Sequence, residues 1–422
     1  MRAVAHKQLR HVLSVTSGAT PETGKPEYWD GDIRWVTPED ISVLDGYWLS
    51  ETRRSITQAG YDACGTSLAP RGSIVLTKRA PIGQLAVLAE PACSNQGCFL
   101  LTSRGELDSR YYYYWLVTQV DRLQALGRGS TFMELSTDDL KALQVPAPPL
   151  LNQRTIADYL DHETARIDDL IEAKERVLRL LAEKRRALIT RAVTRGLDPY
   201  APLRDSGIPW LGEIPAHWEV TRLKFVASVQ TGVALGKDYG GRELRDYPYL
   251  RVANVQDGYL DLADVKTIAL PESEAALCRL HKGDVLMIEG GDADKLGRGA
   301  IWTGEIEPCL HQNHVFAVRP REITSEWLAT WTSTDIAKAY FESRAKQSTN
   351  LASISATNLM ELTLLRPPVD EQMTILLQVR AKTAKLDAIR WATERTVGLL
   401  KERRAALITS AVTGQIDVGA AA

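Results

Sequence analysis

The chain has 422 residues, of which 44% are hydrophobic and 25% charged, and its formal net charge at pH 7 is −2. This composition is that of a soluble globular protein with about two to four domains, and it excludes a uniformly basic nucleic-acid binder, because positive charge would have to be concentrated locally. Residues 1–15 lack the apolar core of a secretion signal, no run approaches the ~18 apolar residues of a membrane span, and the scattered cysteines are typical of a reducing compartment, so we expect a cytoplasmic protein without a membrane partner.

Residues 1–150 are predicted to form a mixed α/β domain. Short runs of β-branched and leucine residues, broken by Gly and Pro, fill 71–90, which is typical of strands joined by tight loops. The segment 108–126 has the pattern of a helix. Pro148 and Pro149 then close the domain, because proline ends a strand and fixes φ before the next element.

Residues 151–195 are predicted to form a long helix, and residues 370–414 repeat it. In both segments, the residues that are spaced alternately four and three positions apart are mostly apolar, with some polar residues among them. This spacing is typical of the seam of a coiled coil. We expect the two helices to pack antiparallel on each other as a spacer of about 60 Å, at ~1.5 Å per residue. The apolar members of the predicted helix–helix seam are Ile156, Leu160, Ile167, Leu170, Val177, Leu181, Leu188, Ile375, Val379, Leu386, Ile389, Leu400 and Leu407.

A linker at 196–218 and a second domain at 219–369 lie between the helices, and the second domain is predicted to repeat the first. A shift of 219 residues aligns 153–198 with 372–417 without a gap, and 21 of these 46 positions are identical. Upstream, the offset drifts between 214 and 219, which is what loop insertions produce between two copies of one fold. The sequence therefore predicts an α+β protein in which two similar α/β domains are separated by two long antiparallel coiled-coil helices, with a pseudo-two-fold internal repeat.

Several motifs flank or recur in the two copies. The first copy contains YWDGDIRW (28–35) and RAPIG (79–83), and the second contains SGIPWLGEIPAHWE (206–219) and GGDADKLGR (290–298). Both helices are preceded by Pro-Pro and end with Arg-x-Ala-Leu-Ile-Thr. In these motifs and in its duplicated layout, nearly the whole chain resembles the specificity subunits of type I restriction-modification enzymes.

The resemblance implies that each α/β domain is a target recognition domain for one half of a bipartite, asymmetric site on double-stranded DNA. The helices would set the unread spacer and hold two methyltransferase (modification) subunits, which restriction and translocase subunits could join. The expected function is DNA sequence specificity that directs methylation and cleavage by these partners. No catalytic residue, metal or cofactor is expected in this chain, because S-adenosylmethionine, ATP and magnesium would belong to the partner subunits.

Two segments imitate catalytic motifs without completing them. Asp198–Tyr200 lacks one proline of the Asp/Asn-Pro-Pro-Tyr/Phe segment of adenine methyltransferases and falls in the linker. Gly232–Lys237 is one residue short of a P-loop and is followed by Asp instead of Ser or Thr. Both departures favour a subunit without its own chemistry.

Two further clusters each have a structural and a functional interpretation. Cys309, His311 and His314 could ligate a metal, but a fourth ligand has no obvious source, so an ordinary strand is preferred. The aromatic cluster Tyr111–Trp115 is interpreted as core packing, with base stacking as the alternative.

Basic loops at equivalent positions of the two copies are candidate DNA contacts. Arg and Lys can neutralise phosphates, and Arg, Lys, Asn and Gln can read base edges in the major groove. The alternative for each is a solvated surface charge, or a turn or capping role for the asparagines. The predicted DNA-binding residues are Lys78, Arg79, Arg128, Ser130, Thr131, Lys295, Arg298, Asn313, Lys346, Gln347 and Asn350.

The basic helix ends, Lys184–Arg186 and Arg403–Arg404, are assigned to favourable interactions with the helix dipole and to partner-subunit contacts, with DNA as the alternative. Two other functions stay open. One is a self-sufficient DNA methyltransferase or nuclease, which methyl transfer by the chain alone would reveal. The other is a structural coiled-coil adaptor, which would not need two diverged α/β domains.

Overall fold

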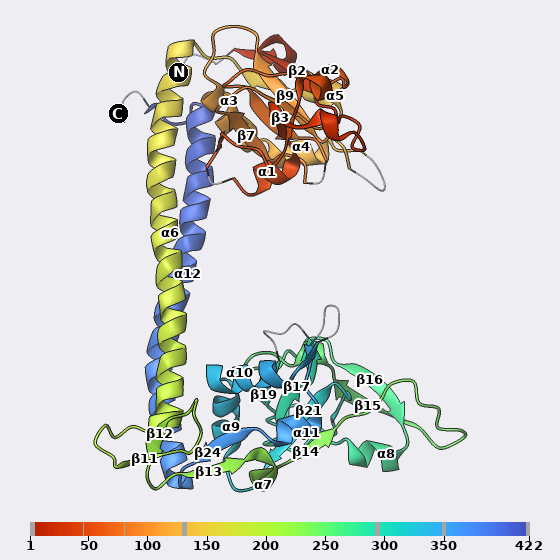
Figure 1. Ribbon diagram of the computed structural model, residues 1–422, viewed down its shortest axis with the longest axis vertical. Helices are drawn as coiled ribbons and strands as arrows, with labels where there is room; N and C mark the ends of the chain where they lie inside the picture. Colours follow the sequence, from red (N-terminus) through yellow and green to blue (C-terminus); the bar gives the residue numbers. More distant parts are fainter. Residues whose placement is uncertain are drawn as a thin grey trace. The chain divides into compact units, whose positions relative to one another are not determined.

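A computed structural model describes residues 5–44, 46–79, 81–128, 133–291, 296–347 and 352–418. The chain forms two compact units, and the long helices belong to both. The first unit comprises residues 1–175 together with 395–422, and the second comprises residues 176–394. Each unit therefore takes one part of α6 (Leu150–Arg195) and one part of α12 (Val369–Val412), which are labelled in Figure 1.

The first unit is built on a five-stranded sheet with the order β2-β9-β6-β7-β4 and a three-stranded sheet with the order β5-β3-β8. In the larger sheet β6 and β7 are buried along their whole length, as expected for runs of Ile, Val and Leu in central strands. The strands of the larger sheet are β2 (Leu13–Ser17), β4 (Trp48–Leu49), β6 (Ile74–Thr77), β7 (Leu85–Leu88) and β9 (Cys98–Ser103). Those of the smaller sheet are β3 (Trp29–Val36), β5 (Ser55–Ile56) and β8 (Ala92–Ser94).

Short helices and one strand pair complete the first unit. Strand β1 (His6–Gln8) pairs with β10 (Gln144–Pro146), the strand that precedes the Pro-Pro segment. The helices are η1 (Leu9–His11), η2 (Pro26–Tyr28), α1 (Pro38–Ser42), α2 (Gln58–Asp62), α3 (Ser109–Val117), α4 (Val120–Ala125) and α5 (Thr137–Ala142).

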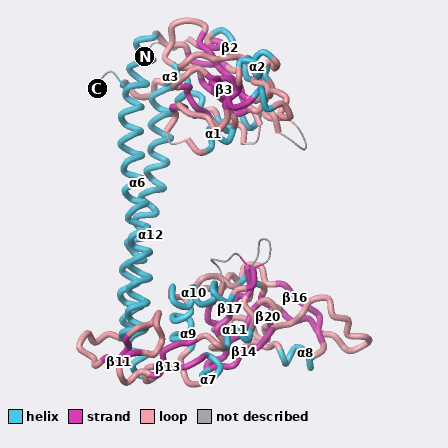
Figure 2. Tube along the Cα trace, in the orientation of Figure 1, coloured by secondary structure: helices cyan, strands magenta, loops and turns pink. Residues whose placement is uncertain are grey.

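The second unit has a four-stranded sheet with the order β14-β21-β17-β19 and a three-stranded sheet with the order β16-β15-β20. The larger sheet contains β14 (Ala227–Thr231), β17 (Val285–Ile288), β19 (Gly299–Ile301) and β21 (Val315–Pro320). The smaller one contains β15 (Arg245–Leu250), β16 (Lys266–Leu270) and β20 (Leu310–His311). Figure 2 shows these strands in magenta.

The remaining strands of the second unit form small ribbons around these sheets. They are β11 (Leu203–Asp205) with β12 (Glu213–Pro215), β13 (Glu219–Arg222) with β24 (Thr363–Arg366), and β18 (Gly290–Gly291), β22 (Lys346–Gln347) and β23 (Ala352–Ser353) in one ribbon. The helices are α7 (Leu223–Val226), η3 (Val252–Asn254), α8 (Glu272–Leu277), α9 (Ser325–Thr332), α10 (Asp335–Arg344) and α11 (Ala356–Met360).

The two units share one topology, which confirms the predicted internal repeat. Strands β2, β9, β6 and β7 have the pairing that β14, β21, β17 and β19 have in the second unit. In the smaller sheets, β3 pairs parallel with β8 and antiparallel with β5, and β15 pairs parallel with β20 and antiparallel with β16. The mixed helix and sheet composition of the predicted fold class is confirmed as well.

One close backbone approach occurs in both copies and requires glycine. A Cβ atom on Gly18 would lie 2.1 Å from the carbonyl oxygen of Ser94, and a Cβ atom on Gly232 would lie 2.1 Å from that of His311. In each copy the residue after the glycine donates its N–H to the same carbonyl oxygen, at 3.0 and 2.8 Å. Gly232, which opens the P-loop-like segment of the sequence, is therefore part of the repeated structural frame.

A buried glutamine attaches each long helix to its α/β domain. Gln153 and Gln372 are 5% and 0% exposed. Each side-chain amide donates to a carbonyl of the preceding Pro-Pro segment, at 2.8 Å in both units. Each amide oxygen accepts a backbone N–H from the residue that caps a helix, Asp108 at 2.9 Å before α3 and Thr324 at 3.1 Å before α9. We call this arrangement the glutamine clamp.

Ion pairs show that the parts of α6 and α12 within the first unit run antiparallel, as predicted, and one further pair links the two helices in the second unit. As the residue number rises along α6, the number of its partner on α12 falls, and Figure 1 shows the two helices alongside each other. The pairs are Asp168–Arg404 (2.9 Å) and Glu175–Lys401 (3.5 Å) in the first unit and Arg185–Asp387 (3.3 Å) in the second. None of the helices in the described part of the chain combines the length and apolarity that a membrane crossing needs.

The predicted heptad seam consists of two rows of residues, each with a step of seven along the helix. The structure differs from the prediction in one of these two rows. Leu170, Val177 and Ile389 are 44%, 39% and 51% exposed, so the prediction is wrong for these three residues. The other ten predicted seam residues are buried or partly buried. They are Ile156, Leu160, Ile167, Leu181, Leu188, Ile375, Val379, Leu386, Leu400 and Leu407.

On α6 the displaced row lies one residue further along the chain. Thr164 is buried, and Ile171 and Leu178 are partly buried, in place of the predicted positions 163, 170 and 177. Both rows contain apolar residues, so hydrophobic periodicity did not separate them. The hydroxyl of Thr164 donates to the carbonyl of Leu160 at 2.6 Å, which allows a polar residue to lie in the seam without an unpaired donor.

Candidate nucleic-acid interface

Three of the predicted DNA-binding residues of the first unit meet at Glu134. Lys78 and Arg79 follow β6, and Arg128 follows α4. Arg79 and Arg128 each form an isolated antiparallel bridge with Glu134. Arg128 and Glu134 exchange two backbone N–H···O bonds of 3.0 Å, and the N–H of Leu135 donates to the carbonyl of Lys78 at 2.9 Å. We call Lys78, Arg79, Arg128 and Glu134 the basic ribbon.

The carboxylate of Glu134 lies between two of these cations. The Lys78 ammonium is 3.0 Å from Glu134 Oε1 and 3.0 Å from Ser17 Oγ, and it lies 5.2 Å from the centre of the Phe99 ring. Arg79 Nε is 3.1 Å from Glu134 Oε2. Burial opposes ionisation of Glu134, but the hydrogen bonds and charges of Lys78 and Arg79 outweigh it and lower the pKa of this carboxyl. Glu134 is therefore ionised at neutral pH.

Exposure separates the cations of the ribbon. The side chain of Lys78 is only 11% exposed, whereas those of Arg79 and Arg128 are 47% and 78% exposed. Arg128 reaches Asp139 at 3.3 Å. The two predicted contacts Ser130 and Thr131 lie outside the described residues.

The second unit has an equivalent ribbon made of β18, β23 and β22. β23 pairs antiparallel with both Gly290–Gly291 and Lys346–Gln347. Lys346 is exposed, and Gln347 lies beside it in β22. At the 219-residue offset, Ser353 stands where the first copy has Glu134, so this ribbon lacks the central carboxylate. Two predicted contacts of this unit, Lys295 and Asn350, lie outside the described residues.

Arg298 and Asn313 are tied to their own domain. Arg298 Nη2 donates to Gln256 Oε1 at 2.7 Å and to the carbonyl of Val255 at 3.2 Å, and its side chain is partly buried. Asn313 donates its backbone N–H to the carbonyl of Val233 at 2.9 Å. For both residues a DNA contact stays a prediction.

The three candidate metal ligands of the second unit face different partners. Cys309 is 1% exposed, and His314 is 2.8 Å from Glu289 at the surface. His311 is fully buried and donates from Nδ1 to the carbonyl of Val315 at 2.6 Å. Burial lowers the pKa of His311. Within the residues that the structure describes, no group of three or more His, Cys, Asp or Glu side chains is arranged to hold a metal ion.

The aromatic cluster Tyr111–Trp115 lies mostly in the core of the first unit, as preferred from the sequence. Tyr111, Tyr112 and Tyr114 are each 1% exposed. The hydroxyl of Tyr114 donates to Asp161 of α6 at 2.8 Å, a carboxylate that also accepts from Tyr47 at 2.7 Å and from Arg110 at 2.7 Å. These bonds fix the orientation of α6 on its domain, which the sequence did not reveal.

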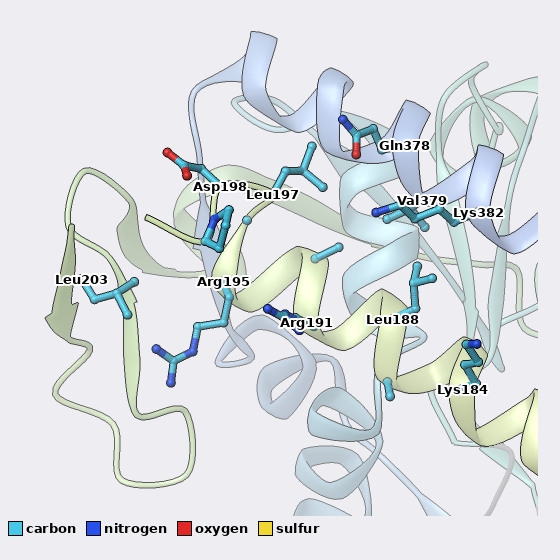
Figure 3. A pocket seen from close by; sticks show the side chains of 14 residues that line it. Lys184, Leu188, Arg191, Arg195, Leu197, Asp198, Leu203, Gln378, Val379 and Lys382 are labelled. Carbon is cyan, nitrogen blue, oxygen red and sulfur yellow. The ribbon is translucent and has the colours of Figure 1, made fainter. Parts of the chain in front are cut away.

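An open pocket of about 900 Å³ lies in the second unit, between the end of α6, the beginning of α12 and residues 196–203. Leu188, Leu197 and Val379 give it an apolar side, and cations surround it (Figure 3). These cations are Lys184, Arg191, Arg195 and Lys382. Arg185, from the basic helix end, points elsewhere and pairs with Asp387 across the two helices. The assignment of the helix ends to partner contacts stays a prediction.

Glu134, Asp161 and the role of the glutamine clamp were not found from the sequence. An acidic residue within a basic loop does not match a DNA-binding pattern, although Glu134 is a position at which the two copies differ in charge. Gln153 and Gln372 were visible as identical positions, but their partners are distant in sequence, 45 and 48 residues away.

Residues 1–179 match the family model described as the type I restriction modification DNA specificity domain. The MjaIX type I restriction enzyme specificity subunit of Methanocaldococcus jannaschii is 31% identical over 258 residues, which cover 60% of this chain and 58% of that protein. The EcoKI specificity subunit of Escherichia coli is 22% identical over 306 residues, or 70% of this chain and 62% of that protein. In both cases the match spans about three fifths of the relative's length.

Solved structures agree with this fold over nearly the whole chain. A chain from a structure described as the basis of complex assembly and conformational transition of the type I R-M system gives a TM-score of 0.72 at 17% identity, with 99% of both chains covered. The crystal structure of the HsdS subunit from Thermoanaerobacter tengcongensis gives 0.51 at 16% identity, with 98% of both chains covered. Residues 1–179 are thus similar to the type I restriction modification DNA specificity domain, and the fold of the whole chain is similar to that of the HsdS subunit.

Proposed function

We propose that this chain is the DNA sequence-specificity subunit of a type I restriction-modification complex. Each unit would recognise one half of a bipartite, asymmetric site on double-stranded DNA. The observation that carries the proposal is the backbone pairing of the basic ribbon, which recurs at the same place of the second unit with different residues, Lys346 being the cation of the second ribbon. A shared frame with divergent loops suits the recognition of two different sequences.

The same proposal assigns chemistry to partner subunits in the cytoplasm. Two methyltransferase subunits would bind S-adenosylmethionine, and restriction subunits would use ATP and magnesium to translocate and cleave DNA. The chain itself would contribute recognition and no catalytic group. The repeated helices α6 and α12 offer two similar surfaces, which supports a pair of identical partners.

Sequencing of modified bases tests this function. Cells that carry the chain together with its methyltransferase should show modified adenines or cytosines at one bipartite sequence, with two specific parts and an unread spacer. The methyltransferase with the chain omitted should leave that sequence unmodified. The purified chain with S-adenosylmethionine should transfer no methyl group, and transfer by the chain alone would favour a self-sufficient methyltransferase instead.

A further inference from the structure

We propose that Arg79 presents its terminal guanidinium nitrogens to a pair of hydrogen-bond acceptors on DNA, and that Glu134, held by Lys78, positions it. This inference rests on the proposed function and names one recognition device of the first unit. Arg79 would be the contacting residue, and Glu134 and Lys78 would act through it.

The geometry leaves one edge of the Arg79 guanidinium available. Nε donates to Glu134 Oε2 at 3.1 Å, and the structure gives Nη1 and Nη2 no partner among the described residues. A guanidinium whose inner nitrogen is fixed by a carboxylate presents its two terminal nitrogens in a fixed direction. That is the arrangement which donates two parallel hydrogen bonds to one ligand.

Lys78 holds the carboxylate in place from the protein side. Its ammonium donates to Glu134 Oε1 and Ser17 Oγ and lies over the Phe99 ring, so three neighbours restrain it. With 11% of its side chain exposed, Lys78 could not reach a phosphate without leaving these partners. One carboxylate oxygen of Glu134 thus accepts a hydrogen bond from the mostly buried Lys78, and the other accepts one from the exposed Arg79.

The comparison of the two copies assigns this device to the first unit. Ser353 replaces Glu134 at the equivalent point of the second ribbon, and the Arg79 position corresponds to Gly290, which pairs with Ser353. A serine there can neither neutralise a buried lysine nor fix a guanidinium. The two units therefore differ in how they present positive charge, although their backbones pair in the same way.

Two groups on DNA offer the required pair of acceptors, the O6 and N7 atoms of guanine and the oxygens of one phosphate. A guanine contact would specify one base of the first half-site. A phosphate contact would add affinity without sequence information and would release counterions. Both use the same donor pair of Arg79, and modified-base sequencing and salt-dependent binding distinguish them.

The test uses the full chain in complex with its methyltransferase. Four variants are compared with wild type: Arg79→Ala, Arg79→Lys, Glu134→Gln and the double variant of Arg79→Ala with Glu134→Gln. Glu39→Gln is the matched control, because it also removes one carboxylate of an ion pair in the same unit, 3.1 Å from Arg53. The probes are a duplex with the target sequence of the wild-type complex and a random-sequence duplex, each titrated at several salt concentrations.

Glu134→Gln should weaken binding of the target duplex about tenfold, while Glu39→Gln should leave that affinity unchanged. Arg79→Ala should cause a similar loss, and the double variant should lose no more than Arg79→Ala alone, because Glu134 acts through Arg79. If the acceptor is guanine, Arg79→Ala makes one base of the first half-site degenerate in modified-base sequencing. If it is a phosphate, binding weakens on every duplex and the salt slope falls by about one.

Two outcomes would overturn the proposal. One is a Glu134→Gln complex that behaves like the Glu39→Gln control, and the other is additive losses from Arg79→Ala and Glu134→Gln. If Glu134→Gln does not fold, Arg79→Lys decides, because it keeps the charge and the Lys78–Glu134 pair but lacks the paired donors. Unchanged affinity of Arg79→Lys for the target duplex would contradict the proposal. A wild-type complex without any target preference would instead refute the proposed function itself.

Discussion

Among single residues, His311 is a buried imidazole whose protonation would destabilise the folded state. Nδ1 donates to the carbonyl of Val315, while the buried Nε2 has no partner within the described residues, so a second proton would create an unpaired buried donor. Burial lowers the pKa of His311, Asp284 opposes this shift, and Arg319 adds to it. Because the pKa is lower in the folded state, the unfolded imidazole binds a proton first as pH falls below about 6.5, and stability present above that pH is lost.

We therefore expect His311→Asn, which keeps a donor for Val315, to flatten the pH dependence of unfolding. Wild type should lose up to about 1.4 kcal/mol of unfolding free energy per pH unit from this group below about pH 6.5. His314→Asn is the control, because that imidazole is exposed and pairs with Glu289 at the surface. Urea unfolding between about pH 7.5 and about pH 5.5 measures both, and an unaltered slope in His311→Asn would contradict the prediction.

At the scale of elements, the glutamine clamp makes each long helix part of its domain. Gln372→Ala would leave the N–H of Thr324 and a proline carbonyl without their partner in a buried site, at a cost of about 2–4 kcal/mol. Gln378→Ala, on an exposed face of the same helix, should change stability by less than about 0.5 kcal/mol. Denaturant unfolding of the full chain compares them, and equal effects of the two substitutions would show that the clamp is not a stabilising contact.

The elements also show where sequence reasoning succeeds and where it does not. The repeat was predictable because identical residues such as Ile156 and Ile375 recur at a fixed offset, and the shared sheet topology follows from it. The displaced seam row was not, because Leu170 and Ile171 are both apolar neighbours and only packing decides between them. Glu134 was missed because its two cationic partners are 55 and 56 residues away and tertiary contacts of that kind leave no local pattern.

At the scale of the whole molecule, we expect the paired helices to determine the distance between the two half-sites. Because α6 and α12 are paired, seven residues should be removed from both, at 176–182 and 390–396. This shortens each helix by about 10 Å and nearly two full turns, which corresponds to a spacer about three base pairs shorter. Modified-base sequencing should then show unchanged half-site bases at a reduced spacing, and changed bases at an unaltered spacing would contradict the model.

The division of the helices between the units has a consequence for synthesis on the ribosome. The core of the first unit includes Ile408, Ala411, Val412 and Val418, and the hydroxyl of Tyr111 donates to the carbonyl of Val412, 301 residues later in the chain. The second unit, residues 176–394, is continuous and is translated in full before those residues appear. The first unit, whose synthesis begins first, is thus the last to be completed. Until Val412 and its neighbours have been translated, the apolar surface around Tyr111 stays exposed.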